Sequence, residues 1–296
     1  GFGVCNNPEF LREGTAVWDY YNPPKTVIGE SDSVAGDKLT ELYAGMSAPL
    51  IRTSIETAEM VKYADNVWHA TKVAFGNEIG RLCKSLSIDS HDVMNIFVKD
   101  LKLNLSPYYL KPGFAFGGSC LPKEVRAVSH LAGEMGVSVP LIDSLTVSND
   151  HHIQEALRLL SPFKGKRVGF LGVTFKSNTD DLRESPTLEL MARLLAAGGT
   201  VRAYDPNLRF GPHLRGQIDY VRHACPSQAA LMDELDAMTL PSAAELVASS
   251  DVVVVSHATD EFRNAVAGRG AEVHVLDLVR LFPRRPSEAT YEGIAW

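Results

Sequence analysis

The residues around Cys120 are of the types that surround a nucleophile. Gly117 and Gly118 precede it, and Pro122 follows it. Glycines let a backbone approach a ligand closely, and proline favours the first turn of a helix. We therefore expect Cys120 at or just before a helix N-terminus, where the helix dipole, aided by Lys123, stabilises a thiolate. From these residues alone, a buried structural thiol beside a loop is an alternative of equal weight.

Two further pairs of polar residues have spacings that suit catalysis. Lys62 and Asn66 lie four residues apart, hence on one face of a helix, and could bind a developing oxyanion. Glu9 and Glu13 are also four apart, and a carboxylate pair can transfer protons. By spacing alone, a solvated helix face and two surface glutamates are the commoner interpretations.

The elements that must position these residues change along the chain. One strand over 26–29 and one helix over 37–46 are too little for a core without a partner sheet. From Thr53, in a capping box with Glu56, apolar residues at steps of three and four predict a helix of about 30 residues. Shorter helices are predicted over 91–99, 121–135 and 141–160.

The hydrophobic period changes again after residue 161. Ser185-Pro186 is a typical helix start, and Gly198-Gly199 ends that helix. Because strands and a helix alternate, we expect a parallel sheet. No G-x-G-x-x-G follows a strand, so the sheet lacks the usual fingerprint of a dinucleotide site. The predicted strands cover 167–173, 201–204, 252–255 and 273–278.

Composition argues against several classes of protein. The net charge of -7 argues against binding nucleic acid, and no apolar run is long enough for a membrane span. The four cysteines form no C-x-x-C pair, so we expect no metal site. The start of the chain has neither a basic n-region nor an apolar h-region, from which we expect a cytoplasmic protein.

Four motifs, taken together, resemble those of the UDP-glucose/GDP-mannose dehydrogenase family. They occur in the family's order, and the resemblance covers essentially the whole chain. The stretch 103–109, with 68–70, is more similar to members that act on GDP-mannose than to those that act on UDP-glucose. The motifs are Asn7-Pro8-Glu9-Phe10-Leu11-Arg12-Glu13-Gly14, K-Y-x-x-N at 62–66, Gly117 to Lys123, and Phe175-Lys176 with Asp180 to Pro186.

The resemblance implies oxidation of a sugar primary alcohol to a carboxylate with two NAD in sequence. Cys120 would attack the aldehyde to give a thiohemiacetal, whose oxidation gives a thioester that water hydrolyses. Lys62 and Asn66 would bind the negative oxygen, and Glu13 would be the base. Glu124, also a catalytic candidate, stands where the family usually has Asp and reaches one methylene further.

The resemblance also implies binding residues. Lys111 stands where many GDP-mannose enzymes have Arg, so a bidentate phosphate contact becomes a point-charge contact. The residues implied for the nucleotide sugar are Phe10, Leu11, Arg12, Tyr109, Lys111, Phe116, Gly117 and Lys176. Those implied for NAD are Glu13, Lys123 and Arg183.

We therefore expect an α/β protein with an α-helical bridging domain and a C-terminal Rossmann-like parallel sheet that lacks the G-x-G-x-x-G fingerprint. Residues 1–52 would be a remnant of an N-terminal α/β domain, 53–160 a helical dimerisation domain, and 161–296 a nucleotide-sugar-binding domain. Without the family's complete NAD-binding domain, the chain alone is expected not to turn over NAD.

The expected partners are a nucleotide sugar, GDP-mannose or UDP-glucose, and a second copy of the chain; no nucleic acid, membrane or metal is expected. Three alternatives to GDP-mannose oxidation stay open. They are UDP-glucose oxidation, a catalytically silent nucleotide-sugar-binding module, and a cysteine hydrolase that pairs Cys120 with one of the nine histidines.

Overall fold

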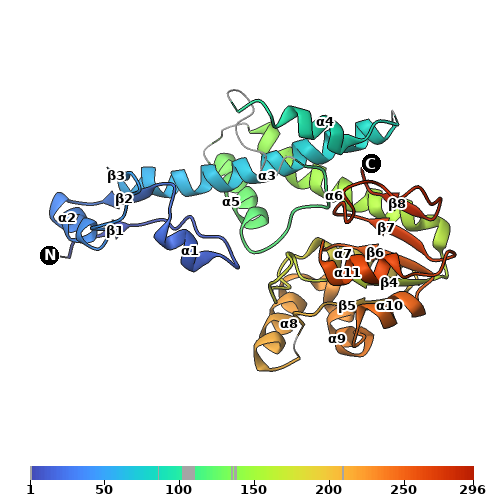
Figure 1. Cartoon of the computed structure of the whole chain (residues 1–296). Coiled ribbons are helices and arrows are strands. Elements are labelled where there is room, and N and C mark those ends of the chain that lie inside the picture. Colours follow the sequence, from blue (N-terminus) through green and yellow to red (C-terminus); the bar gives the residue numbers. More distant parts are fainter. Residues whose placement is uncertain (1, 86, 102–110, 135, 137–138, 209) are drawn as a thin grey trace. The chain divides into compact units, whose positions relative to one another are not determined.

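The structure is a computed structural model that describes residues 2–85, 87–101, 111–134, 136, 139–208 and 210–296. It divides into two compact units, residues 1–68 and 69–296. The long helix α3 (Ile55–Ser85) contributes to both (Figure 1). Its 31 residues confirm the predicted length.

A three-stranded sheet forms the first unit. Strand β2 (Thr26–Glu30) lies in the middle, antiparallel to β1 (Cys5–Asn6) and parallel to β3 (Leu50–Thr53). Helix α1 (Ala16–Tyr21) precedes β2, and α2 (Ser33–Glu41) follows it. The prediction of a single strand was wrong. It missed β1, which has two residues, and β3, whose two middle residues are exposed and give no alternation.

The start of α3 packs closely on β2. Ala58 is fully buried, and a Cβ on Gly29 would lie 2.7 Å from the Cβ of Ala58, so a larger residue would push the helix away. Ser54 caps the helix, because its Oγ accepts a hydrogen bond from the N–H of Thr57 at 3.2 Å. The predicted capping box at Thr53 is therefore wrong: Thr53 ends β3 instead.

Three helices after α3 begin the second unit: α4 (Ser90–Phe97), α5 (Leu121–Glu134) and α6 (Pro140–Leu160). They confirm the predicted helices to within a few residues. Helix α5 packs on α6, and α6 packs on α7 (Pro186–Ala196). Ser185 caps α7 and Pro186 occupies its first position, as predicted.

A five-stranded, all-parallel sheet organises the rest of this unit. Its order is β5 (Thr200–Tyr204), β4 (Arg167–Leu171), β6 (Val252–Val255), β7 (His274–Asp277) and β8 (Tyr291–Gly293). The chain runs from β4 outward to β5, then returns to β6 on the other side of β4. Open parallel sheets bind ligands at the carboxyl ends of the strands beside such a reversal. The parallel sheet confirms the prediction; β8 was not predicted.

Alternate strand residues face two apolar cores. Phe170 and Val254 face the core that contains α6, α7, α8 (Pro212–Ala224) and α9 (Ala229–Met238). Leu171 and Val253 face the core that contains α10 (Ala243–Ser249) and α11 (Asp260–Ala267). Burial on both faces explains why these strands are continuous apolar runs. Among the described residues, no helix combines the length and apolarity that crossing a bilayer requires.

Candidate functional site

Cys120 caps helix α5. Its carbonyl oxygen accepts a hydrogen bond from the N–H of Glu124 at 3.0 Å, and the helix begins at the next residue. The cysteine is exposed, and the Oγ of Ser119 lies 3.8 Å from its sulfur. The predicted position at a helix N-terminus is confirmed. The thiol is therefore open to a substrate.

An asparagine on α6 holds the loop before Cys120. The Oδ1 of Asn149 accepts a hydrogen bond from the N–H of Phe116 at 2.8 Å. The Nδ2 of Asn149 donates to the carbonyl oxygen of Phe116 at 2.9 Å. Both backbone polar groups of the buried Phe116 are therefore paired with one side chain. Phe116, implied in nucleotide-sugar binding, is itself 8% exposed.

Two more buried side chains hold the same loop. The Oδ1 of Asn77 on α3 accepts from the N–H of Gly113 at 3.1 Å, and its Nδ2 donates to the carbonyl of Phe114 at 3.2 Å. The Nε2 of His152 lies 2.7 Å from the carbonyl oxygen of Gly113. The sequence analysis missed Asn77, Asn149 and His152. The signal available in the sequence was a polar residue whose spacing places it on the apolar face of its helix.

The connection from β4 to α7 packs directly on the Cys120 loop. The N–H of Gly118 donates to the carbonyl oxygen of Glu184 at 3.3 Å. A Cβ on Gly117 would lie 2.2 Å from the same oxygen, so only glycine fits. Gly118 has a φ of +83°, the left-handed region that favours glycine. Close approach and turn geometry therefore explain both glycines before the nucleophile.

Lys123 and Glu124 lie in the first turn of α5. The side chain of Glu124 is 9% exposed and that of Lys123 60% exposed; the Nζ of Lys123 lies 3.6 Å from Oε1 of Glu124. A carboxylate shielded from solvent one turn from the nucleophile can exchange a proton with a reacting group. The predicted catalytic role of Glu124 and cofactor role of Lys123 stay predictions.

Lys176 and Arg183 lie in the connection that leaves the carboxyl end of β4, next to the reversal of strand order. Lys176 is exposed. Arg183 donates two hydrogen bonds to the buried Asp181, with Nε at 2.8 Å and Nη2 at 2.7 Å from its oxygens. Its guanidinium is thus fixed in direction, while 39% of the side chain stays exposed.

Two of the residues implied in nucleotide-sugar binding lie within or directly after residues 102–110, which the structure does not describe. Lys111 is exposed. Tyr109, with the stretch 103–109 that favours GDP-mannose, lies outside the described residues.

The first unit contains the other catalytic candidates. The Nζ of Lys62 donates to the carbonyl oxygen of Glu9 at 2.7 Å and to its Oε1 at 2.8 Å. It also lies 5.9 Å from the ring centroid of Phe10. Asn66, one turn further along α3, is 8% exposed, and its Nδ2 has no hydrogen-bond partner among the described residues. A ligand oxygen would satisfy such a buried donor.

Asp19, which the sequence analysis missed, anchors the segment around Arg12. Its carboxylate accepts from the Arg12 N–H at 2.9 Å, Nε at 3.0 Å and Nη2 at 2.6 Å, and from the Thr15 hydroxyl at 3.0 Å. The bonds from Arg12 lower the pKa of Asp19 to about 2, although its burial opposes this. Leu11 and Glu13, in the same segment, are exposed; their binding and catalytic roles stay predictions.

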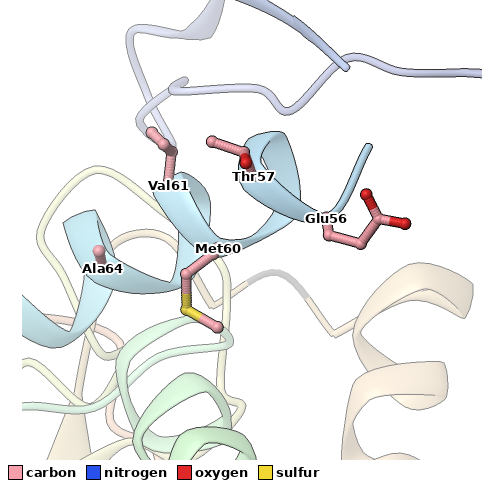
Figure 2. A pocket seen from close by; sticks show the side chains of 5 residues that line it. All are labelled: Glu56, Thr57, Met60, Val61 and Ala64. Atoms are coloured by element: carbon pink, nitrogen blue, oxygen red, sulfur yellow. The ribbon is translucent and has the colours of Figure 1, made fainter. Parts of the chain in front are cut away.

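A shallow pocket lies along the first turns of α3, away from the catalytic candidates. Figure 2 shows its lining: Glu56, Thr57, Met60, Val61 and Ala64. These positions share one helix face, which continues to the 48% exposed Trp68. At 100° per residue, this face is about half a turn from that of Lys62 and Asn66. Separately, no cluster of His, Cys, Asp or Glu suited to a metal occurs in the described part of the chain.

Three family models match the chain. Residues 56–151 match the central domain of the UDP-glucose/GDP-mannose dehydrogenase family. Residues 169–284 match that family's UDP binding domain, and residues 1–47 match its NAD binding domain.

Individual relatives agree with these matches. GDP-mannose 6-dehydrogenase of Pseudomonas putida is 44% identical over 297 residues, which cover 100% of this chain and 66% of the relative. A UDP-glucose dehydrogenase structure from Pyrobaculum islandicum has a TM-score of 0.83 at 30% identity, covering 100% of this chain and 64% of that one. A ternary complex of GDP-mannose dehydrogenase from Pseudomonas aeruginosa has a TM-score of 0.56 at 42% identity, covering 99% and 65%. The chain thus spans about two thirds of the length of its relatives.

Proposed function

Because the chain belongs to the UDP-glucose/GDP-mannose dehydrogenase family, we propose that it serves as a GDP-mannose 6-dehydrogenase, which oxidises GDP-mannose to GDP-mannuronate. The observation that carries the proposal is the exposed Cys120 at the N-terminus of α5, inside a glycine loop that side chains of α3 and α6 hold by its backbone. A thiol on a fixed loop suits covalent catalysis on an aldehyde.

Different residues of the chain carry out different steps of the proposed reaction. The Cys120 thiolate adds to the C6 aldehyde, which makes the carbonyl oxygen an alkoxide. The resemblance to the family implies that the donors for that oxygen would be the Lys62 ammonium and the Asn66 amide, whose Nδ2 has no hydrogen-bond partner among the described residues. After oxidation to a thioester, Glu13, or Glu124 near the nucleophile, takes a proton from the attacking water, and the thiolate leaves. NAD, when bound, accepts the hydride in each of the two oxidation steps.

The described residues fit part of a dinucleotide site. Lys123 and Arg183 are cations with 60% and 39% of their side chains exposed, which suits contact with phosphate. No strand–G-x-G-x-x-G–helix unit, whose N–H groups would cradle a pyrophosphate, occurs in the sequence. We therefore propose that the 296-residue polypeptide by itself binds nucleotide sugar but does not reduce NAD.

Guanine is the proposed base. The support is the 44% identity over 297 residues to a GDP-mannose enzyme, against 33% over 256 residues and 36% over 223 residues to two UDP-glucose 6-dehydrogenases, one of them putative. Lys176, beside the strand-order reversal, and Lys111 are the proposed diphosphate ligands. Phe116 and Gly117 are the proposed contacts of the nucleotide. The UDP-glucose alternative is tested by calorimetric titration of the chain with both nucleotide sugars: tighter binding of UDP-glucose would reverse the choice of base and leave the family intact.

A homodimer through α3 is part of the proposal. Met60 is 47% exposed and Trp68 48% exposed on the pocket face of this helix. An apolar stripe at helical spacing that is open to solvent is typical of a surface that packs on another helix.

The test of the reaction uses a chimera in which these 296 residues follow the preceding residues of the Pseudomonas putida relative. With GDP-mannose it should form two NADH for each GDP-mannuronate. Cys120→Ser should lower turnover by about a thousandfold or more, as loss of a nucleophile does. Binding of GDP-mannose without NADH formation would favour the silent binding module. Full activity of Cys120→Ser would refute the covalent route.

A further inference from the structure

A bidentate ion pair ties helix α5 to the connection between β4 and α7. The Nη1 and Nη2 of Arg126 lie 2.8 and 2.7 Å from the two carboxylate oxygens of Glu184. Two parallel N–H···O bonds fix direction as well as distance. The side chains of Arg126 and Glu184 are 54% and 24% exposed, so solvent screens their charges. The pair therefore contributes more to geometry than to stability.

Glu184 also holds the other side of the nucleophile. Its carbonyl oxygen accepts the hydrogen bond from Gly118, and Gly117 packs against the same oxygen. One residue thus contacts the chain before Cys120 through its main chain and the chain after Cys120 through its side chain. A shift of Glu184 would move the two ends of this segment together.

The backbone of Glu184 is held in an unfavourable conformation. Its φ is +48°, in the left-handed region, which costs a non-glycine residue about 1 kcal/mol or more. Such conformations persist where the surroundings determine them, and they are common at functional sites. The neighbouring Ser185 fixes the turn, because its Oγ donates to the carbonyl of Val173 at 2.6 Å while capping α7.

We propose that Arg126 and Glu184 are positioning residues for Cys120. Together they set the first turns of α5 against the glycine loop, so that the thiol stays exposed at the helix N-terminus. Neither residue is assigned a contact with substrate. The proposal rests on the proposed function only in taking Cys120 as the nucleophile.

The test is the rate of Cys120 alkylation by iodoacetamide at neutral pH on the 296-residue chain, followed by peptide mass spectrometry with Cys5 as the internal reference. Arg126→Met and Glu184→Gln should each slow this alkylation by about threefold, on the scale of a solvent-exposed ion pair, because the start of α5 and the glycine loop are no longer held together around the exposed thiol. The double variant should be no slower than either single variant, since the two residues act as one unit.

A matched pair supplies the control. Arg158 also makes a bidentate contact, through Nε and Nη2, with Glu155 at 2.8 and 2.7 Å inside helix α6, so Arg158→Met should leave the rate of Cys120 alkylation unchanged. Circular dichroism shows whether Arg126→Met folds. If it does not, Arg126→Lys takes its place: it keeps the charge but loses the bidentate guanidinium, and should give an intermediate rate of Cys120 alkylation.

The positioning role would be overturned if the single variants alkylated Cys120 at the wild-type rate, or if the double variant were slowed by both single effects combined. An equal effect of Arg158→Met would overturn it as well. The alkylation assay does not measure NADH, so a result that overturns the positioning role would not refute the proposed reaction. An inactive chimera would refute the reaction without affecting the coupling between Arg126 and Glu184.

Discussion

The carboxylate of Asp19 receives three hydrogen bonds from Arg12, two from the guanidinium and one from the backbone N–H. Its side chain is 7% exposed. The segment between these residues therefore has a fixed course, although it lies outside regular structure until α1 begins at Ala16. Arg12, implied in sugar binding, is oriented by this contact and partly neutralised by it.

The Asp19 contact predicts a pH dependence of stability. The pKa of Asp19 is lowered from 3.8 to about 2, so its contribution is complete above about pH 4 and is lost as pH falls through about 2. Because 42% of the Arg12 side chain is exposed and solvent screens the ion pair, we expect the shift to correspond to about 1 kcal/mol of stability. Asp19→Asn should lower the free energy of unfolding by about that amount at neutral pH, and the difference from wild type should disappear near pH 2.

Urea unfolding at several pH values measures this difference. The exposed Asp236, replaced by Asn, is the control and should show no such convergence. A constant difference between wild type and Asp19→Asn across this range would show that the charge of Asp19 does not stabilise the fold.

Gly117→Ala should damage the nucleophile loop. The added Cβ would lie 2.2 Å from the Glu184 carbonyl oxygen and 2.6 Å from the Pro186 ring, and neither group is at the end of a flexible side chain. Overpacking of this kind costs about 1–3 kcal/mol. Thermal unfolding should show the loss, and Cys120 should alkylate more slowly.

Gly133 offers the matched control for that substitution. It lies in α5, and no described atom, apart from its chain neighbours and its own helix backbone, lies within 4 Å of a Cβ placed there. Gly133→Ala should raise the free energy of unfolding by about 0.5–1 kcal/mol, through helix propensity. If both alanine variants behaved alike, the close approach to Glu184 would not be what requires glycine at 117.

Lys62→Ala in the chimera should reduce kcat about a hundredfold, on the scale of a lost oxyanion donor. The Kd for GDP-mannose should change less, because the negative oxygen exists only after the thiol has added. Steady-state kinetics and calorimetry separate the two effects. Lys38→Ala, an exposed lysine on α2, is the control. A change in Kd without a change in kcat would instead mean that Lys62 binds the unreacted GDP-mannose.

Met60→Asp should convert the dimer to a monomer. It puts a charge into the apolar stripe of α3, where it would be buried without a partner. Light scattering coupled to size-exclusion chromatography gives the mass. Val34→Asp on α2, a 62% exposed position, should leave the mass unchanged. A dimeric Met60→Asp variant, or a monomeric wild type, would contradict the proposed surface.

Local sequence signals predicted the elements that have a periodic apolar pattern or a distinct helix terminus. The period of apolar residues gave the length of α3, and Pro122 after a glycine pair placed Cys120 at a helix start. Ser185-Pro186 marked the start of α7 for the same reason. By contrast, β1 and β8, with two and three residues, are too short to show any period.

The supporting residues of the site depend on contacts between distant segments. Asn149 pairs with Phe116, 33 residues away, and Arg126 pairs with Glu184, 58 residues away. No spacing rule links such positions, because the fold alone brings them together. The motif around Cys120 made it a candidate nucleophile in advance, whereas the groups that hold its loop were visible only in three dimensions.

The most direct test of the central claim is whether GDP-mannose protects Cys120. The chain is treated with iodoacetamide at increasing concentrations of GDP-mannose, and the alkylation of Cys120 and Cys5 is followed by peptide mass spectrometry. The account predicts that GDP-mannose slows alkylation of Cys120 saturably while Cys5 reacts as before, and that UDP-glucose needs a higher concentration. An alkylation rate of Cys120 that is unaffected by saturating GDP-mannose would contradict a nucleotide-sugar site built around this thiol.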